Sequence, residues 1–114
     1  ADLSISKALS PTTVTENGQI TYTFVISNTG NTEATATGNV VVTDTFSPML
    51  RNIAVTYNGT AWTEGTNYTY NAATGVFTTL AGQITVPAAT FTQNTDGTFT
   101  VTPGTATLVI TGTV

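Results

Sequence analysis

The feature that most constrains the fold is an alternation of apolar and polar side chains with a period of two residues. It is clearest in Gln19–Asn28 and Thr105–Val114. The apolar positions in these two stretches are Ile20, Tyr22, Phe24, Ile26, Ala106, Leu108, Ile110 and Val114. A period of two is typical of β-strands with one buried face, and no segment shows sustained helical periodicity. The sequence therefore predicts two packed β-sheets, and the residues expected between them are Ile20, Tyr22, Phe24, Ile26, Val40, Val42, Leu108 and Ile110.

Shorter strand-like runs with turn residues between them continue along the whole chain. We predict strands near 2–9, 19–28, 39–46, 52–58, 67–71, 76–79, 83–86, 89–93, 98–102 and 105–114. Asn17-Gly18 and Asn58-Gly59 tolerate the positive φ that tight turns need, and the runs around 71–75 and 94–97 are typical of hairpins. Many short strands at this spacing predict an all-β Greek-key β-sandwich that forms one domain over residues 1–114.

Charge is scarce, and this restricts the possible partners. Charged residues make up 7% of the chain, the net charge is −4, and Lys7 and Arg51 are the only basic residues. Such a balance argues against nucleic-acid binding and against attraction to an anionic membrane, and no apolar stretch is long enough to insert into a bilayer. A threonine-rich, charge-poor chain suits a surface-exposed module. Because it begins at Ala1, we expect a mature or excised part of a longer protein.

Two of the few charges fall on apolar faces of predicted strands. Lys7 shares a face with Leu3, Ile5 and Leu9, and Asp44 shares one with Val40, Val42 and Phe46. A buried charge is costly unless it is paired. We therefore expect Lys7 and Asp44 to be largely buried and within hydrogen-bonding reach, so that Lys7→Ala costs roughly 3–5 kcal/mol.

Four runs occur in an order that resembles a known family. They are ADLSISK at 1–7, ITYTFVISNTGN at 20–31, VVTDTF at 41–46 and ATLVITGTV at 106–114. Together they resemble the prokaryotic surface-repeat family catalogued as domain of unknown function eleven. The resemblance implies an immunoglobulin-like sandwich in large secreted or wall-associated proteins, where such modules act as stalk, adhesin or fibre segments. The stretch 58–103 is longer than is usual in these repeats, so we expect it to add hairpins.

The resemblance also implies a candidate cross-link. Some sandwich modules of Gram-positive surface proteins carry a lysine–asparagine isopeptide bond promoted by a buried acid, and Lys7 and Asp44 stand where the amine and the assisting acid are expected. Burial favours the neutral amine that this reaction needs, and a protonated carboxyl can polarise the amide. The acceptor is unidentified, and Asn28 and Asn39 are the internal candidates. The family's Asn-Thr-Ala-Thr-Val-like run is missing here, so the acceptor is either absent or supplied by another chain. A plain Lys7–Asp44 ion pair is the main alternative, and a Lys7 side chain that reaches solvent is another.

Other chemistry has little support in the sequence. The chain has no histidine and no cysteine, so it lacks the usual base and thiol nucleophile, and we predict no enzyme, no cofactor and no metal site. Asp96 with Asn94 falls short of a calcium site. The aromatic residues Tyr57, Trp62, Tyr68 and Tyr70 could form a carbohydrate platform, although we favour core and cross-strand pairing for them.

These observations predict a non-enzymatic structural module of an extracellular, cell-surface or fibre protein such as a pilus. The alternative is a ligand- or carbohydrate-binding adhesin module with a host or glycan ligand. For the structural module, the expected partners are other copies of the chain or neighbouring domains of the parent protein. We expect an open sheet edge beside Leu3–Leu9 and Thr105–Val114, where an extended segment of a neighbour completes the sheet head to tail.

Overall fold

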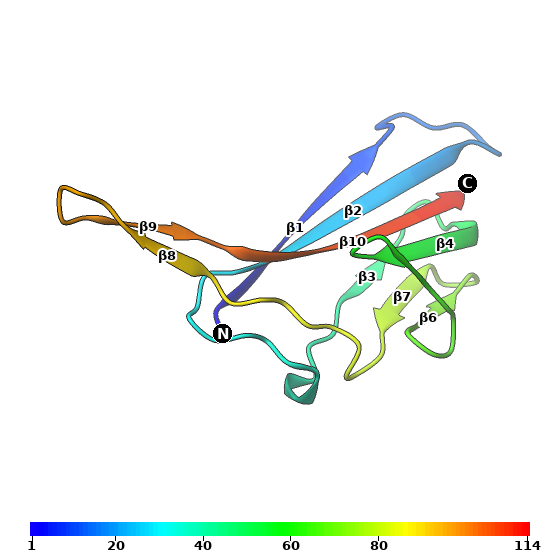
Figure 1. Ribbon diagram of the computed structural model, residues 1–114. Coiled ribbons are helices and arrows are strands. Elements are labelled where there is room, and N and C mark those ends of the chain that lie inside the picture. Colours follow the sequence, from blue (N-terminus) through cyan, green and yellow to red (C-terminus); the bar gives the residue numbers. More distant parts are fainter.

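The computed structural model describes residues 1–114 and is all-β, with antiparallel strands that form several sheets (Figure 1). The strands are β1 (Leu3–Ser10), β2 (Gln19–Asn28), β3 (Thr43–Thr45), β4 (Arg51–Tyr57), β5 (Thr60–Trp62), β6 (Tyr68–Asn71), β7 (Val76–Thr79), β8 (Thr90–Gln93), β9 (Phe99–Thr102) and β10 (Gly104–Thr113). One short 3-10 turn spans Ala36–Gly38. No helix has the length and hydropathy needed to cross a membrane.

The strands form two facing layers and a separate hairpin. One sheet has five strands in the order β1-β2-β10-β4-β5, the second has three in the order β3-β7-β6, and β8 pairs only with β9. The chain crosses from one layer to the other between β2 and β3, returns at β4, crosses again after β5 and returns to β10. This arrangement is sandwich-like, and its two layers enclose the hydrophobic core.

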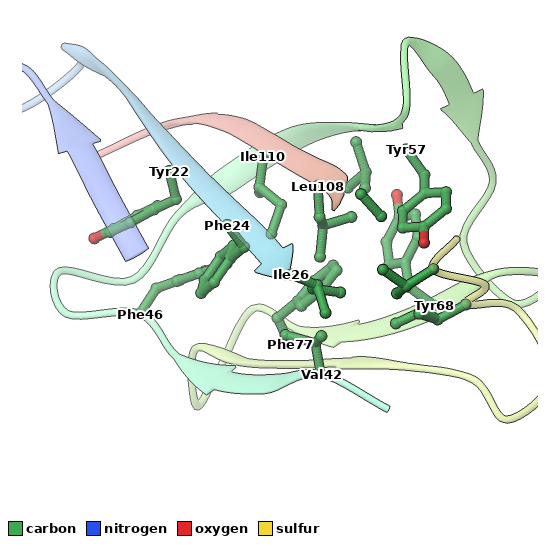
Figure 2. Close-up of a cluster of buried hydrophobic side chains, with 14 of the residues drawn as sticks. Tyr22, Phe24, Ile26, Val42, Phe46, Tyr57, Tyr68, Phe77, Leu108 and Ile110 are labelled. Carbon is green, nitrogen blue, oxygen red and sulfur yellow. The ribbon is translucent and has the colours of Figure 1, made fainter. Parts of the chain in front are cut away.

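The core lies where the alternating faces of β2 and β10 meet the smaller sheet (Figure 2). Every second side chain of β2 and β10 is buried, as the period-two pattern predicted. From the opposite layer, Phe46 stacks on Tyr22 with ring centroids 4.7 Å apart, and Phe77 lies 5.9 Å from Phe46 and 5.3 Å from Tyr68. This row of aromatic rings joins the two sheets. Val40 is only half-buried, unlike the other predicted core residues.

Several predicted strands change in extent. The run 39–46 is reduced to Thr43–Thr45. Just before this strand, the backbone N–H of Val42 donates to the Thr79 hydroxyl at 2.8 Å, while the Val42 carbonyl accepts from the Thr79 backbone N–H at 2.9 Å. The run 83–86 has only an isolated bridge from Val86 to Ala34. The structure adds β5, which follows a tight turn with Asn58 at φ 49° and Gly59 at φ 81°. The expected extra hairpins in 58–103 are present.

The expectation of an open edge at Thr105–Val114 is wrong. Strand β10 pairs with β2 on one side and with β4 on the other, so it lies inside the five-stranded sheet. Strand β1 pairs with β2 alone and is therefore an edge strand, as expected. A sequence pattern marks which side chains face the core, but strand order depends on long-range pairing, which this pattern does not encode.

The β8–β9 hairpin leaves the body of the molecule as a long arm (Figure 1). Every residue of both strands is exposed. Gly104 lies where the arm joins β10, and a Cβ atom there would come within 1.9 Å of the Pro87 carbonyl oxygen. Glycine is thus required for the close approach of the two chain segments at the base of the arm.

Candidate functional site

The structure brings Lys7 and Asp44 together across the open side of the two sheets. The Lys7 Nζ donates to the Asp44 Oδ2 at 2.6 Å, which joins edge strand β1 to β3 of the smaller sheet. The ammonium also lies 4.8 Å from the ring centroid of Tyr22 and 5.8 Å from that of Phe24. Cation–π attraction adds to the ion pair in such an arrangement. The predicted contact between the two charges is therefore confirmed.

The predicted burial of this pair is wrong. The side chain of Lys7 is 38% exposed and that of Asp44 is 23% exposed. On the same face of β1, Ile5 is 53% exposed. The reason is that the smaller sheet ends at β3, whose outer edge has no partner strand, and no further strand covers the inward face of β1.

An apolar groove remains along this open side. Its volume is about 360 Å³, and its apolar lining comes from Leu3, Ile5, Ile26, Val40, Val41 and Val42. Strands β1 and β3, which flank it, each pair on one side only. Unpaired strand edges beside an exposed apolar surface are a template for adding another strand. We call this feature the β1–β3 groove.

Asn28, the first candidate acceptor, has a structural role at the end of β2. Its buried amide oxygen accepts hydrogen bonds from the backbone N–H groups of Asp2 at 3.0 Å and Gly30 at 2.9 Å. Its amide nitrogen donates to the carbonyls of Thr32 at 2.8 Å and Pro87 at 3.1 Å. Asn28 pairs with Leu3, four residues along β1 from Lys7 and thus about 13 Å away along the strand.

Asn39, the second candidate acceptor, ends the 3-10 turn in a left-handed conformation. Its φ is 52°, its backbone N–H donates to the Ala36 carbonyl, and the residue is exposed. The Lys7 amine donates its hydrogen bond to Asp44, and no hydrogen bond joins it to Asn28 or Asn39. The structure thus brings together the amine and the acid of the candidate cross-link, with neither asparagine bonded to the amine.

The aromatic cluster serves the core, as the pairing interpretation predicted. Tyr57 and Trp62 stack with centroids 4.7 Å apart, and the Tyr57 hydroxyl donates to the Thr85 carbonyl at 2.6 Å. Burial raises the pKa of the Tyr57 phenol. Burial, followed by the nearby Glu64 carboxylate, raises the pKa of Tyr68, which stacks on Phe77.

The remaining acidic residues stay apart from one another. No three of the acidic side chains gather into a group that could hold a metal ion. Asp96, at the tip of the arm, accepts hydrogen bonds from the hydroxyl and the backbone N–H of Thr98, and these bonds lower its pKa. Asp96 therefore shapes the tight turn that joins β8 to β9.

Sequence reasoning placed the charged pair but missed the groove. One signal was present, because the run Val40-Val41-Val42 puts apolar side chains on both faces of an extended segment. Val41 is the outward one and is 51% exposed. An apolar side chain that breaks the alternation of an edge segment can therefore indicate a surface that a partner covers.

The half-exposed pair should contribute modestly to stability. We expect a double-mutant cycle of Lys7→Ala and Asp44→Asn to give a coupling free energy of about 0.5–1 kcal/mol, because solvent screens the charges. This is well below the roughly 3–5 kcal/mol expected for removing one partner of a buried pair. Urea unfolding of the four proteins measures it, and 1 M salt should reduce it. A coupling above about 2 kcal/mol would mean that the pair is desolvated in solution.

Comparison with family models, curated proteins and solved structures finds no match to this chain, so the resemblance to the surface-repeat family stays a prediction.

Proposed function

We propose that this chain is a non-enzymatic structural module of an extracellular surface protein or fibre, joined to a neighbour by a β-strand added at its open side. The observation that carries the proposal is the β1–β3 groove, where two unpaired strand edges flank an exposed apolar surface. Strand addition combines main-chain hydrogen bonds with pockets for alternate side chains, and the groove offers both.

Strand β1 has few features that would prevent such pairing. Natural edge strands are protected by charges, proline or bulges. Strand β1 contains no proline, its pairing with β2 is continuous from Leu3 to Ser10, and its single charge, Lys7, is already paired with Asp44. The edge is therefore long, regular and nearly neutral.

The immunoglobulin-like Greek-key topology and the extracellular location belong to this proposal. The two facing antiparallel layers and the repeated crossing between them support the topology. The resemblance of four ordered runs to surface repeats, and a charged fraction of only 7%, support the location. A surface module of this kind gains solubility from threonine hydroxyls and amides.

The same edge carries the residues for a covalent form of the contact. If an incoming strand places an asparagine against Lys7, the Nζ forms an amide bond with the side-chain carbonyl carbon and ammonia leaves. Asp44, at 2.6 Å from the amine, is placed to move the proton. A docked strand would also exclude the water that now reaches Lys7. Denaturing electrophoresis of native assemblies should then show covalently linked species larger than the single chain, and Lys7→Ala should abolish them.

The adhesin alternative has weaker support. A carbohydrate platform needs aromatic faces free to stack on sugar rings. Here Tyr57 and Trp62 stack on each other, and the Tyr70 hydroxyl donates to the Leu50 carbonyl at 2.6 Å. No hollow of the structure is lined mainly by free aromatic faces.

Association at the open side tests the proposal. We expect sedimentation velocity of the purified chain to show association that grows between about 10 µM and 1 mM, the range of weak interfaces. Ile5→Lys places a charge in the groove and should keep the chain monomeric. Met49→Lys is the matched control, because Met49 is 50% exposed, close to the 53% of Ile5, and lies outside the groove. A wild-type chain that stays monomeric at 1 mM would refute the proposal.

A further inference from the structure

The arm formed by β8 and β9 has one apolar face and one polar face. Phe91 pairs with Val101, and Gln93 pairs with Phe99, so these side chains share a face, while four threonines, Thr90, Thr92, Thr100 and Thr102, occupy the other. Phe91 and Phe99 contact each other with centroids 6.3 Å apart, yet they are 49% and 67% exposed. The apolar face of the arm therefore covers nothing within its own chain.

An isolated two-stranded hairpin is at best marginally stable in water, and independent stability needs a further strand or a packed surface. Each strand of the arm has four residues, and each pairs with the other alone. The tip is closed by the turn that Asp96 stabilises through Thr98. The arm thus has a defined shape, and its exposed apolar face would be stabilised by packing against an apolar surface of a partner.

The arm and the β1–β3 groove lie at the same end of the molecule. The arm continues from Gly104 at the start of β10, Gly104 pairs with Asn28, and Asn28 pairs with Leu3 in the groove. Figure 1 shows the arm pointing away from the body, so it does not reach the groove of its own chain. Two copies that meet at this end can each place an arm in the groove of the other.

We infer that the groove is filled by the β8–β9 arm of a second copy of this chain, in a reciprocal exchange that closes a twofold dimer. The inference rests on the proposed function and identifies the segment that binds at the open side of the molecule. Phe91 and Phe99 of the arm would face Ile5 and Val41 of the groove, the most exposed apolar residues of the two surfaces. An isologous contact of this kind uses the same two surfaces on both copies.

The area that can be buried favours the reciprocal form. A phenylalanine buries about 150–250 Å², so the exposed parts of Phe91 and Phe99 amount to about 200 Å². A groove that covers them loses a similar area, which gives about 400 Å² for one contact and about 800 Å² for two. A stable interface needs about 1,000 Å². Only the reciprocal pair, with Val101 and the flanking main chain added, approaches this value.

Charge does not oppose the contact. The strands of the arm carry no charged residue, and the groove lining carries none either. The nearest charges are Asp96 in the turn at the tip of the arm and the Lys7–Asp44 pair on the open side, whose two charges offset each other. Such an interface should associate with little dependence on salt.

Complementation between two variants tests the inference. The double variant Phe91→Ser/Phe99→Ser removes the apolar face of the arm and leaves the groove intact, whereas Ile5→Lys does the reverse. We expect each variant alone to be monomeric where the wild type is dimeric. Their mixture should form a 1:1 heterodimer, at least tenfold weaker than the wild-type dimer, because only one of the two contacts is restored.

Disulfide trapping locates the contact directly, because the natural chain has no cysteine. Phe99→Cys mixed with Val41→Cys should give a disulfide-linked dimer under mild oxidation. Phe99→Cys mixed with Met49→Cys should give much less. If Ile5→Lys blocks association while Phe91→Ser/Phe99→Ser associates as the wild type does, the arm is not the occupant and the inference fails. The proposed function survives that result, whereas a monomeric wild type overturns both.

Discussion

Phe77→Ala should lower the free energy of unfolding by about 3–5 kcal/mol, the cost of deleting a fully buried aromatic side chain. Phe77 has no exposed surface and lies in the central strand of the three-stranded sheet. Its ring contacts the rings of Phe46 and Tyr68, so alanine leaves a cavity in the row that joins the layers. Because whole domains have about 5–15 kcal/mol of stability, this variant loses a large share of it.

Urea unfolding followed by intrinsic fluorescence measures this loss. Phe99→Ala is the matched control, since it deletes the same ring at a position that is 67% exposed in the arm. Measured at a concentration low enough for the chain to be monomeric, the control should change stability by no more than about 0.5 kcal/mol. Equal effects of the two substitutions would mean that the three-stranded sheet does not pack against β2 and β10 as described.

Asn28→Ala should lower the free energy of unfolding by about 3–4 kcal/mol, because leaving a buried polar group without its partner costs about 1–3 kcal/mol. The amide makes four hydrogen bonds, to Asp2, Gly30, Thr32 and Pro87. These link the N-terminal segment, the turn after β2 and the segment that leads into the arm. Alanine leaves all four backbone groups without the partner they have now, although some can turn to water.

Asn28→Asp separates shape from hydrogen bonding, because it keeps the size of the side chain and one acceptor oxygen. The other oxygen would face the carbonyls of Thr32 and Pro87, which in the wild type accept hydrogen bonds from the Asn28 amide nitrogen. Two facing carbonyls and burial favour the neutral acid, so the pKa of this carboxyl should lie above its value in the unfolded chain, about 3.9. A raised pKa stabilises the fold below that unfolded value, and the stabilisation disappears as the pH rises through the folded value.

The stability of Asn28→Asp relative to the wild type should therefore be higher at pH 3 than at pH 7. Thermal melts of both proteins across this range measure the difference and cancel the titration of groups that they share. A difference that does not change with pH would mean that the side chain at position 28 reaches solvent. It would also weaken the view that Asn28 holds the base of the arm in place.

The sequence by itself determined the elements whose pattern is local. The alternation in Gln19–Asn28 and the run Val76–Thr79 predicted β2 and β7 with the bounds they have. Asn58-Gly59 predicted a tight turn, and both residues have positive φ. The same alternation predicted the contact between Lys7 and Asp44. Residues two apart share a face of a strand, and each of these two charges shares its face with apolar side chains.

Only the tertiary structure decided what lies over each face. Whether Lys7 and Ile5 are buried depends on how far the second sheet extends, and it ends at β3, a strand of three residues. The central place of β10 and the projection of β8 and β9 likewise come from pairing between segments far apart in the chain. Side-chain periodicity states which face of a strand is apolar, whereas burial of that face requires a partner surface whose position no local pattern encodes.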